Sequence, residues 1–193
     1  MRSLTSRDAA EHAHVYLSLL GWPVAAGHSY RPDRGCTCLE ETTAQICPRP
    51  GAHPLASHVV VARPDRVDEE FAALPGAGVI APTLGFDAIV LPKPVAMFAL
   101  VQLERHSAQV PCVVSRHEAA LLVAPRTAAA ALGHLSRTVV KLRTGPDGWV
   151  ALPPSHKTRW DTPPWSSRGE PVELPDARDV REPIALAVKG VAR

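Results

Sequence analysis

Three of the four cysteines in this 193-residue chain, and one of its histidines, lie between Cys36 and His53. Cys36 and Cys38 are separated by one residue, Cys47 lies nine residues after Cys38, and His53 lies six residues after Cys47. Thiolate sulfur and imidazole nitrogen are the ligands that Zn²⁺ takes in structural sites. Prolines and glycines between these residues bend the backbone. The pattern therefore predicts a tetrahedral Cys3His zinc site, with residues 35–54 as a zinc-binding loop.

Four protein ligands fill the tetrahedral coordination of zinc, so the predicted site would be structural rather than catalytic. His58 competes with His53 for the fourth position. The alternative interpretation is that Cys36, Cys38 and Cys47 are free thiols in a surface loop.

The N-terminal sequence argues against a secreted protein with disulfides. Residues 1–8 are polar, and no apolar run reaches the length of a signal-peptide core or of a membrane span. Disulfides are rare in reducing compartments. We therefore expect a cytoplasmic protein that does not associate with a membrane.

The composition limits both the core and the partners of the chain. Hydrophobic residues make up 46% of the sequence but aromatic residues only 5%, so alanine, valine and leucine must fill the core. The formal net charge of +2 is too small to indicate nucleic-acid binding by itself, although a local basic patch would suffice. The 20 prolines cluster in the zinc-binding loop and after residue 152, which marks both segments as irregular.

Hydrophobic periodicity and turn residues predict interleaved helices and strands. Helices are expected at 8–20, 65–74, 94–106 and 127–135, with weak helical character at 179–189. Strands are expected at 22–26, 78–81, 86–91, 110–115, 119–124, 138–143 and 148–152, and residues 59–62 are either a strand or the lead into the helix at 65–74. Turns are expected at 82–85 and 144–148.

This order favours an α+β fold in which helices are interleaved with a mostly antiparallel sheet. Residues 1–165 are expected to form one domain that carries the zinc-binding loop as an insertion, and residues 166–193 a C-terminal tail or arm. The tail has apolar residues that could dock on the domain or on a protein partner: Ile184, Leu186, Val188 and Val191.

Several segments, taken in order, resemble the bifunctional DNA primase/polymerase (prim-pol) domain of the archaeo-eukaryotic primase superfamily. They are the helix end Leu20-Gly21-Trp22-Pro23-Val24, the loop end Cys47-Pro48-Arg49-Pro50-Gly51-Ala52-His53-Pro54, the strands at 86–92 and 121–125, and the segment 149–155 followed by Arg159-Trp160. The resemblance covers about residues 8–165. It implies a prim-pol-like fold with a divided catalytic core built on a sheet.

In active members of that family, two acidic residues on one strand and a third on a later strand hold the divalent metals that carry a nucleoside triphosphate. Mg²⁺ prefers such hard oxygen ligands and bridges the reacting phosphates. The matching positions here hold Val90 and Pro92, and the later strand holds Lys141 and Arg143. Asp87 is a weak candidate for a catalytic carboxylate. The resemblance thus implies a degenerate active site, with Mg²⁺ needed only if catalysis remains.

The resemblance also indicates where a nucleotide or a nucleic acid would bind. The family uses an S-x-H motif on the nucleotide; Ser115-Arg116-His117 has this spelling, although the spacing to the next strand places the family histidine nearer residues 119–120. Cations beside an indole can hold phosphate and stack a base. The predicted binding residues are Lys141, Arg143, Ser155, His156, Lys157, Arg159 and Trp160. The alternative is a solvated proline-rich loop whose Trp160 and Trp165 pack on the sheet.

Three functions follow from the sequence. The favoured one is a catalytically inactive prim-pol-like protein that binds single-stranded nucleic acid or a nucleotide. An active primase/polymerase with displaced metal ligands would rely on Asp87 with Asp147 or Asp161. A zinc-stabilised interaction module would present its loop and tail to another protein.

Overall fold

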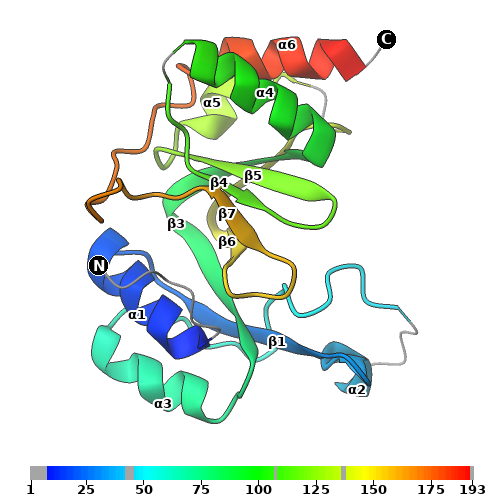
Figure 1. The fold of residues 1–193 in the computed structure, drawn as a ribbon, viewed down its shortest axis with the longest axis vertical. Coiled ribbons are helices and arrows are strands. Elements are labelled where there is room, and N and C mark those ends of the chain that lie inside the picture. The colour runs from blue at the N-terminus through cyan, green and yellow to red at the C-terminus, as the bar shows by residue number, and fades with distance from the viewer. Residues whose placement is uncertain (1–7, 42–45, 107, 136–137, 192–193) are drawn as a thin grey trace. The chain divides into compact units, whose positions relative to one another are not determined.

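The computed structural model describes residues 8–41, 46–106, 108–135 and 138–191, which form two units (Figure 1). The first unit comprises Met1–Pro82 and Val150–Arg159, and the second comprises Thr83–Trp149 and Trp160–Arg193. The chain therefore passes between the units three times. Two long strands, β3 (Ala77–Pro92) and β6 (Lys141–Leu152), each have residues in both units.

In the first unit, β1 (Ala25–Arg31) lies between two antiparallel neighbours. Its end pairs with the two-residue strand β2 (Gly35–Cys36), and its beginning pairs with the first residues of β3. The helical elements of this unit are α1 (Ala9–Leu20), α2 (Cys38–Glu41), the 3₁₀ helix η1 (Pro64–Arg66) and α3 (Val67–Ala72).

Local sequence explains both ends of α1. The Asp8 carboxylate accepts a hydrogen bond from the Ala10 backbone N–H at 2.9 Å, which caps the first turn. Gly21 ends the helix in the left-handed conformation, with φ of 66°. Between these ends, Tyr16 is fully buried, and its hydroxyl donates to the Pro153 carbonyl at 2.7 Å. The helix is thereby joined to the segment after β6.

The second unit is built on antiparallel pairs. Residues 87–92 of β3 pair with β5 (Glu118–Val123), which pairs in turn with β4 (Cys112–Val114). Beyond β4 lies β7 (Arg159–Thr162), and β6 pairs with β3. The helices of this unit are α4 (Lys93–Arg105), α5 (Ala128–Leu132) and α6 (Arg181–Val191).

The core of the second unit lies between one face of this sheet and its helices. Alternate residues of β3 and β5, among them Ile89 and Leu121, pack against Leu103 of α4 and Ile184 of α6. All four side chains are almost completely buried. Helix α6 is thus part of the core of this unit, which is how residues 166–193 are held to the rest of the chain.

The α+β fold with a mostly antiparallel sheet is confirmed, as are helices close to 8–20, 65–74 and 94–106 and strands close to 110–115 and 119–124. No helix among the described ranges is both long and apolar enough to cross a membrane. Helix α5 is shorter than predicted, and β2, α2 and β7 were not predicted.

The predicted turn at 82–85 is wrong, because β3 continues through it as one strand. Pro82 cannot donate a backbone hydrogen bond. It lies between the part of β3 that pairs with β1, which ends at Ile80, and the part that pairs with β5, which begins at Asp87. A proline at this change of partner therefore does not end the strand.

Three other predicted segments also differ from the structure. β6 is continuous across 144–148, although Gly145 bends it with φ of 69°. Of the two alternatives for residues 59–62, the segment forms no strand beyond a single bridge between Val61 and Val24, and it leads into η1; Val59 and Val60 are exposed. The predicted strand at 22–26 begins later and extends to Arg31, because the backbone N–H of Trp22 still completes the end of α1.

Candidate metal centre

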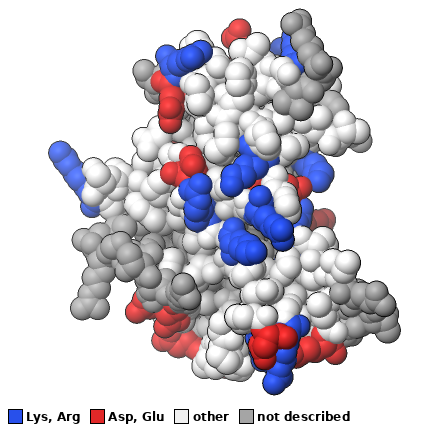
Figure 2. All heavy atoms as spheres, turned by 45° about the vertical axis from the view of Figure 1, so that its right-hand side comes forward, with Lys and Arg blue, Asp and Glu red and all other residues white. Residues whose placement is uncertain are grey.

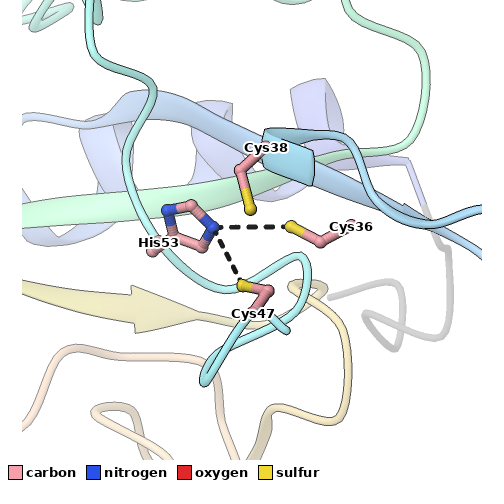
Figure 3. Close-up of side chains that lie close together, drawn as sticks. All are labelled: Cys36, Cys38, Cys47 and His53. Carbon is pink, nitrogen blue, oxygen red and sulfur yellow. Dashed lines mark hydrogen bonds between the residues drawn. The ribbon is translucent and has the colours of Figure 1, made fainter. Parts of the chain in front are cut away.

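Four side chains of the first unit converge on one point (Figure 3). Their ligand atoms, the sulfurs of Cys36, Cys38 and Cys47 and a ring nitrogen of His53, all lie within 4.8 Å of one another. The Nε2 atom of His53 is 3.4 Å from the Cys36 sulfur and 3.4 Å from the Cys47 sulfur. A tetrahedral zinc ion with ordinary bond lengths separates sulfur from nitrogen by about 3.6 Å. The spacing is therefore compatible with a zinc site.

Secondary structure places the two residues of the C-x-C pair. Cys36 ends β2 and Cys38 begins α2, so the chain turns between them at Thr37. The Thr37 hydroxyl accepts a hydrogen bond from the Ser29 backbone N–H at 3.1 Å, and the Thr37 N–H donates to the Ser29 carbonyl at 3.0 Å. Thr37 thus fastens the turn to β1 and directs both flanking thiols toward the same point.

The loop after Cys47 depends on Gly51. Its φ of 63° is a conformation that other residues rarely adopt, and a Cβ there would lie 2.8 Å from the His156 Cβ and 2.9 Å from the Tyr30 Cβ. The Gly51 N–H donates to the Cys36 sulfur at 3.2 Å. A hydrogen bond to sulfur stabilises a thiolate, so the loop backbone supports the ligand set.

His53 is oriented by its own backbone and by β1. Its Nδ1 donates to the Pro54 carbonyl at 3.2 Å, because a carbonyl oxygen can only accept. Nε2 then carries the lone pair and faces the sulfurs, as a metal ligand requires. The His53 carbonyl accepts from the His28 N–H at 3.0 Å, and the His28 ring centroid is 4.4 Å from that of His53.

Burial makes two of the thiols, those of Cys38 and Cys47, hard to ionise without a metal. Burial raises the pKa of Cys38 to about 12, with further increases from its hydrogen bonds to Cys36 and Cys47. Burial also raises the pKa of Cys47. A divalent cation supplies the positive charge that lets adjacent thiols lose their protons. The donor set and its surroundings therefore fit a metal ion that prefers sulfur and nitrogen.

The structure distinguishes the two histidines considered for the fourth position. His58 is outside the four-residue cluster, and its Nδ1 is 2.7 Å from the Leu55 carbonyl in an exposed loop. Among the described residues, the metal cluster found is that of Cys36, Cys38, Cys47 and His53.

The predicted binding residues after β6 differ in their surroundings. Ser155 is 3% exposed, and its hydroxyl accepts from the Val79 N–H at 2.9 Å and donates to the Val79 carbonyl at 3.1 Å. His156 stacks on Tyr30 with ring centroids 3.8 Å apart. Lys157 and Arg159 are exposed. Ser155 and His156 are therefore engaged inside the first unit, whereas the two cations face solvent.

The remaining predicted residues lie in the second unit. Lys141 forms an ion pair with Glu118 at 2.9 Å, and Arg143 lies 4.0 Å from the same carboxylate. The Arg143 guanidinium also sits over the Trp149 ring, 4.7 Å from its centroid, and donates to the Trp149 carbonyl at 2.6 Å. Trp160 makes an edge contact with Trp165.

Asp87 lies on the core side of β3. It is 1% exposed, and one carboxylate oxygen accepts from the Ala128 backbone N–H at 2.9 Å. The Ser115-Arg116-His117 motif forms the turn between β4 and β5, where the Ser115 hydroxyl donates to the Glu118 carbonyl at 2.9 Å. Asp87 is therefore buried and engaged, and the motif belongs to a turn.

Some of the surface charges of this protein form ion pairs. Figure 2 shows basic and acidic side chains beside one another in several places. Ion pairs join Arg66 to Glu69 at 3.1 Å and Arg178 to Asp176 at 2.8 Å. The small net charge thus reflects mixed signs on the surface.

Sequence reasoning missed Thr37, Gly51 and Glu118. Thr37 could have been noticed as the residue between two of the cysteines, and Gly51 as the glycine that follows Pro50 in the same loop. Nothing near Glu118 in the sequence indicates that it pairs with Lys141, because the two residues are brought together by strand pairing.

Comparison with protein-family models, with curated proteins and with solved structures gives no match to this chain. The proposals below therefore rest on the sequence and on the geometry and chemistry of this chain's own residues.

Proposed function

We propose that this protein binds one Zn²⁺ through Cys36, Cys38, Cys47 and His53, and that the ion has a structural role. The observation that carries the proposal is the convergence of three sulfurs and one imidazole nitrogen within 4.8 Å. Four protein ligands leave no coordination position for a substrate or an activated water. The ion would join β2, α2 and the loop after Cys47.

The test is metal analysis of the purified chain, followed by substitution of Co²⁺ for Zn²⁺. We expect one zinc per chain and, for the Co²⁺ form, the intense visible bands of tetrahedral cobalt with thiolate ligands. His53→Ala should lose the metal and the bands. Its matched control, His58→Ala, should keep both.

Cys47→Ser and Cys112→Ser form a second matched pair, because Cys112 is a buried cysteine of the second unit. Only the first should lose zinc. A wild-type protein that contains no zinc and binds no Co²⁺ would refute the proposed metal site.

We further propose that the zinc-stabilised protein is a prim-pol-like protein that binds single-stranded nucleic acid without catalysing nucleotide transfer. Support for binding comes from the sequence resemblance and from the exposure of Lys157 and Arg159, which follow the buried Ser155. Exposed cations attract phosphates and release counterions, so such binding weakens as salt increases.

Support for the absence of catalysis comes from the charges on two strands. A two-metal site needs converging carboxylates. Here Asp87 is buried and bonded to the Ala128 backbone. On β6, Lys141 and Arg143 stand where an acidic residue is expected, and both lie next to Glu118. Cations at these positions would repel Mg²⁺.

The experiment is a titration of a labelled single-stranded oligonucleotide at two salt concentrations, with fluorescence anisotropy as the readout. Lys157→Ala combined with Arg159→Ala should weaken binding and lower its salt dependence. Arg63→Ala combined with Arg66→Ala removes the same charge from another exposed site of the first unit and serves as the control. Equal weakening in both double variants would contradict a specific site.

A parallel assay measures Mg²⁺-dependent incorporation of nucleotides on a primed template. We expect none. Incorporation that depends on Asp87 would overturn the non-catalytic assignment and favour an active polymerase.

A further inference from the structure

Helices α4 and α6 bury one side each in the same core. Ala99 and Leu103 of α4 and Ile184 and Ala187 of α6 all belong to the cluster that covers one face of the β3–β5–β4 sheet. In Figure 1 the two helices lie next to each other within the second unit. The opposite side of each helix is exposed.

These exposed sides carry apolar residues where solvent-facing helix positions are normally polar. Phe98 and Val101, which are three residues apart on α4, are each 46% exposed, and Leu186 of α6 is 50% exposed. We call the surface made by Phe98, Val101, Leu186, Glu182 and Lys189 the α4–α6 face. Exposed apolar side chains on neighbouring helices are a feature of protein interaction sites.

On α6, one acidic and one basic residue flank the exposed Leu186. Glu182, Leu186 and Lys189 follow one another at helical spacing on the exposed side of α6. The acidic residue lies about 6 Å before Leu186 along the helix axis and the basic residue about 4.5 Å after it. Neither Glu182 nor Lys189 forms an ion pair with any other residue in the described part of the chain.

The order Glu182, Leu186, Lys189 is complementary to itself when two copies of α6 run antiparallel. When two copies of α6 pack antiparallel about a twofold axis through Leu186, that residue meets Leu186 of the partner subunit. Glu182 then faces the partner's Lys189, and Lys189 faces the partner's Glu182. A twofold interface requires this reciprocal pattern, because each contact occurs twice with the roles exchanged. Phe98 and Val101 would extend the apolar contact on the α4 side.

We propose that the α4–α6 face is the interface of a symmetric homodimer. The apolar centre excludes water, and the oppositely charged ends set the antiparallel register. The order of charge is complementary to itself, and this favours a second copy of this chain. Binding to an unrelated partner would not require both signs of charge in this order. The inference is independent of the metal site and of nucleic-acid binding.

Sedimentation of the full-length, zinc-loaded chain over a range of micromolar concentrations tests the proposal. We expect a monomer–dimer equilibrium. Phe98→Glu and Leu186→Glu should each weaken dimerisation roughly tenfold or more, because they bury unpaired charges at the centre of the interface. Val60→Glu changes an exposed apolar residue of the first unit, which is 42% exposed, and should leave the dimer unchanged. Circular dichroism shows that each variant is folded.

Charge reversal provides the sharper test. Glu182→Lys alone would place lysine opposite the partner's Lys189, and Lys189→Glu alone would place two acidic residues together, so each should weaken the dimer. The double variant restores opposite charges and should dimerise like the wild type. A monomeric wild type would overturn the proposal, as would a dimer that survives Phe98→Glu and Leu186→Glu or charge reversals that do not compensate one another.

Discussion

The Ser155 hydroxyl makes two backbone hydrogen bonds of the kind that a neighbouring strand would make. It bonds both backbone groups of Val79 on β3, at 2.9 Å and 3.1 Å, and is itself 3% exposed. A buried backbone group without a partner is costly, because water cannot reach it. Ser155 therefore ties the segment after β6 to β3 within the first unit.

Ser155→Ala should lower the free energy of unfolding by about 1–3 kcal/mol, because it leaves the Val79 N–H and carbonyl unsatisfied. Urea denaturation measures the change. Ser115→Ala is a matched control: the Ser115 hydroxyl bonds both backbone groups of Glu118 in the same way, but the turn is only partly buried. Water can replace that hydroxyl, so the control should cost less. Equal losses would contradict the argument from burial.

His156 is held in its neutral form. Burial, and then the nearby charge of Lys157, lower the pKa of His156 below its ordinary value of 6.5. The unfolded chain therefore binds a proton at higher pH than the folded chain does. Stability contributed by neutral His156 is present above pH 6.5 and is lost as the pH falls through the lowered pKa.

His156→Gln should reduce the loss of stability that occurs between pH of about 7.5 and about 5, because glutamine does not titrate. The comparison uses urea denaturation midpoints of the wild type and the variant at both pH values. His106→Gln, which changes an exposed histidine of the second unit, serves as the control. An unchanged pH dependence in His156→Gln would show that other groups account for the effect.

At the scale of elements, α5 shows how a short helix depends on a distant strand. Its five residues are too few to be stable alone in water. The Asp87 carboxylate on β3 accepts from the Ala128 N–H at the start of the helix. The preceding residue, Thr127, donates its hydroxyl to the Ala124 carbonyl and accepts from the Ala177 N–H. Contacts from three segments thus place this helix.

Asp87→Ala should destabilise the chain by about 1–3 kcal/mol, because the buried Ala128 N–H loses its acceptor. Asp87→Asn keeps a carbonyl oxygen of similar shape and should cost less. Urea denaturation of both variants measures the difference. If the two cost the same, the hydrogen bond to Ala128 would not be the reason that Asp87 matters.

β3 shows that a local sequence pattern can predict the wrong secondary structure. A Pro-Thr-Leu-Gly sequence is typical of a turn, yet residues 82–85 continue the strand. The proline is tolerated because the antiparallel partner of β3 changes from β1 to β5 in this region. Which strands lie beside a segment is a property of the folded chain, so the local signal was misleading.

At the scale of the whole molecule, the metal cluster belongs to one of the two units only. All four ligand residues lie within Met1–Pro82. An ion that binds only the folded state stabilises that state, by about 4 kcal/mol when its free concentration is a thousand times its dissociation constant. The proposed zinc should therefore stabilise the first unit selectively.

Removal of the metal by a chelator should speed amide hydrogen exchange in the first unit. The amides of His28, Thr37 and Gly51 are the most sensitive reporters, because those of His28 and Gly51 donate to His53 and Cys36, and Thr37 lies between Cys36 and Cys38. Amides of β5, which lie in the second unit, should exchange at an unchanged rate. Equal acceleration in both units would show that the metal stabilises the whole chain, and no acceleration would count against a structural role.

The sequence by itself determined the elements and groups whose signals are local. The end of α1 at Gly21 follows from a local signal, and the cluster of Cys36, Cys38, Cys47 and a histidine follows from their spacing. These features depend on residues close together in the chain, where backbone geometry restricts the outcome.

Only the tertiary structure decided which residues use their polar groups in the fold. It placed His53 in the cluster and left His58 outside, buried Ser155 against Val79, bonded Asp87 to Ala128 and paired Lys141 with Glu118. Ser155 and Val79 are separated by 76 residues, and Asp87 and Ala128 by 41. Contacts over such separations depend on strand pairing and burial throughout a unit, which no short stretch of sequence specifies.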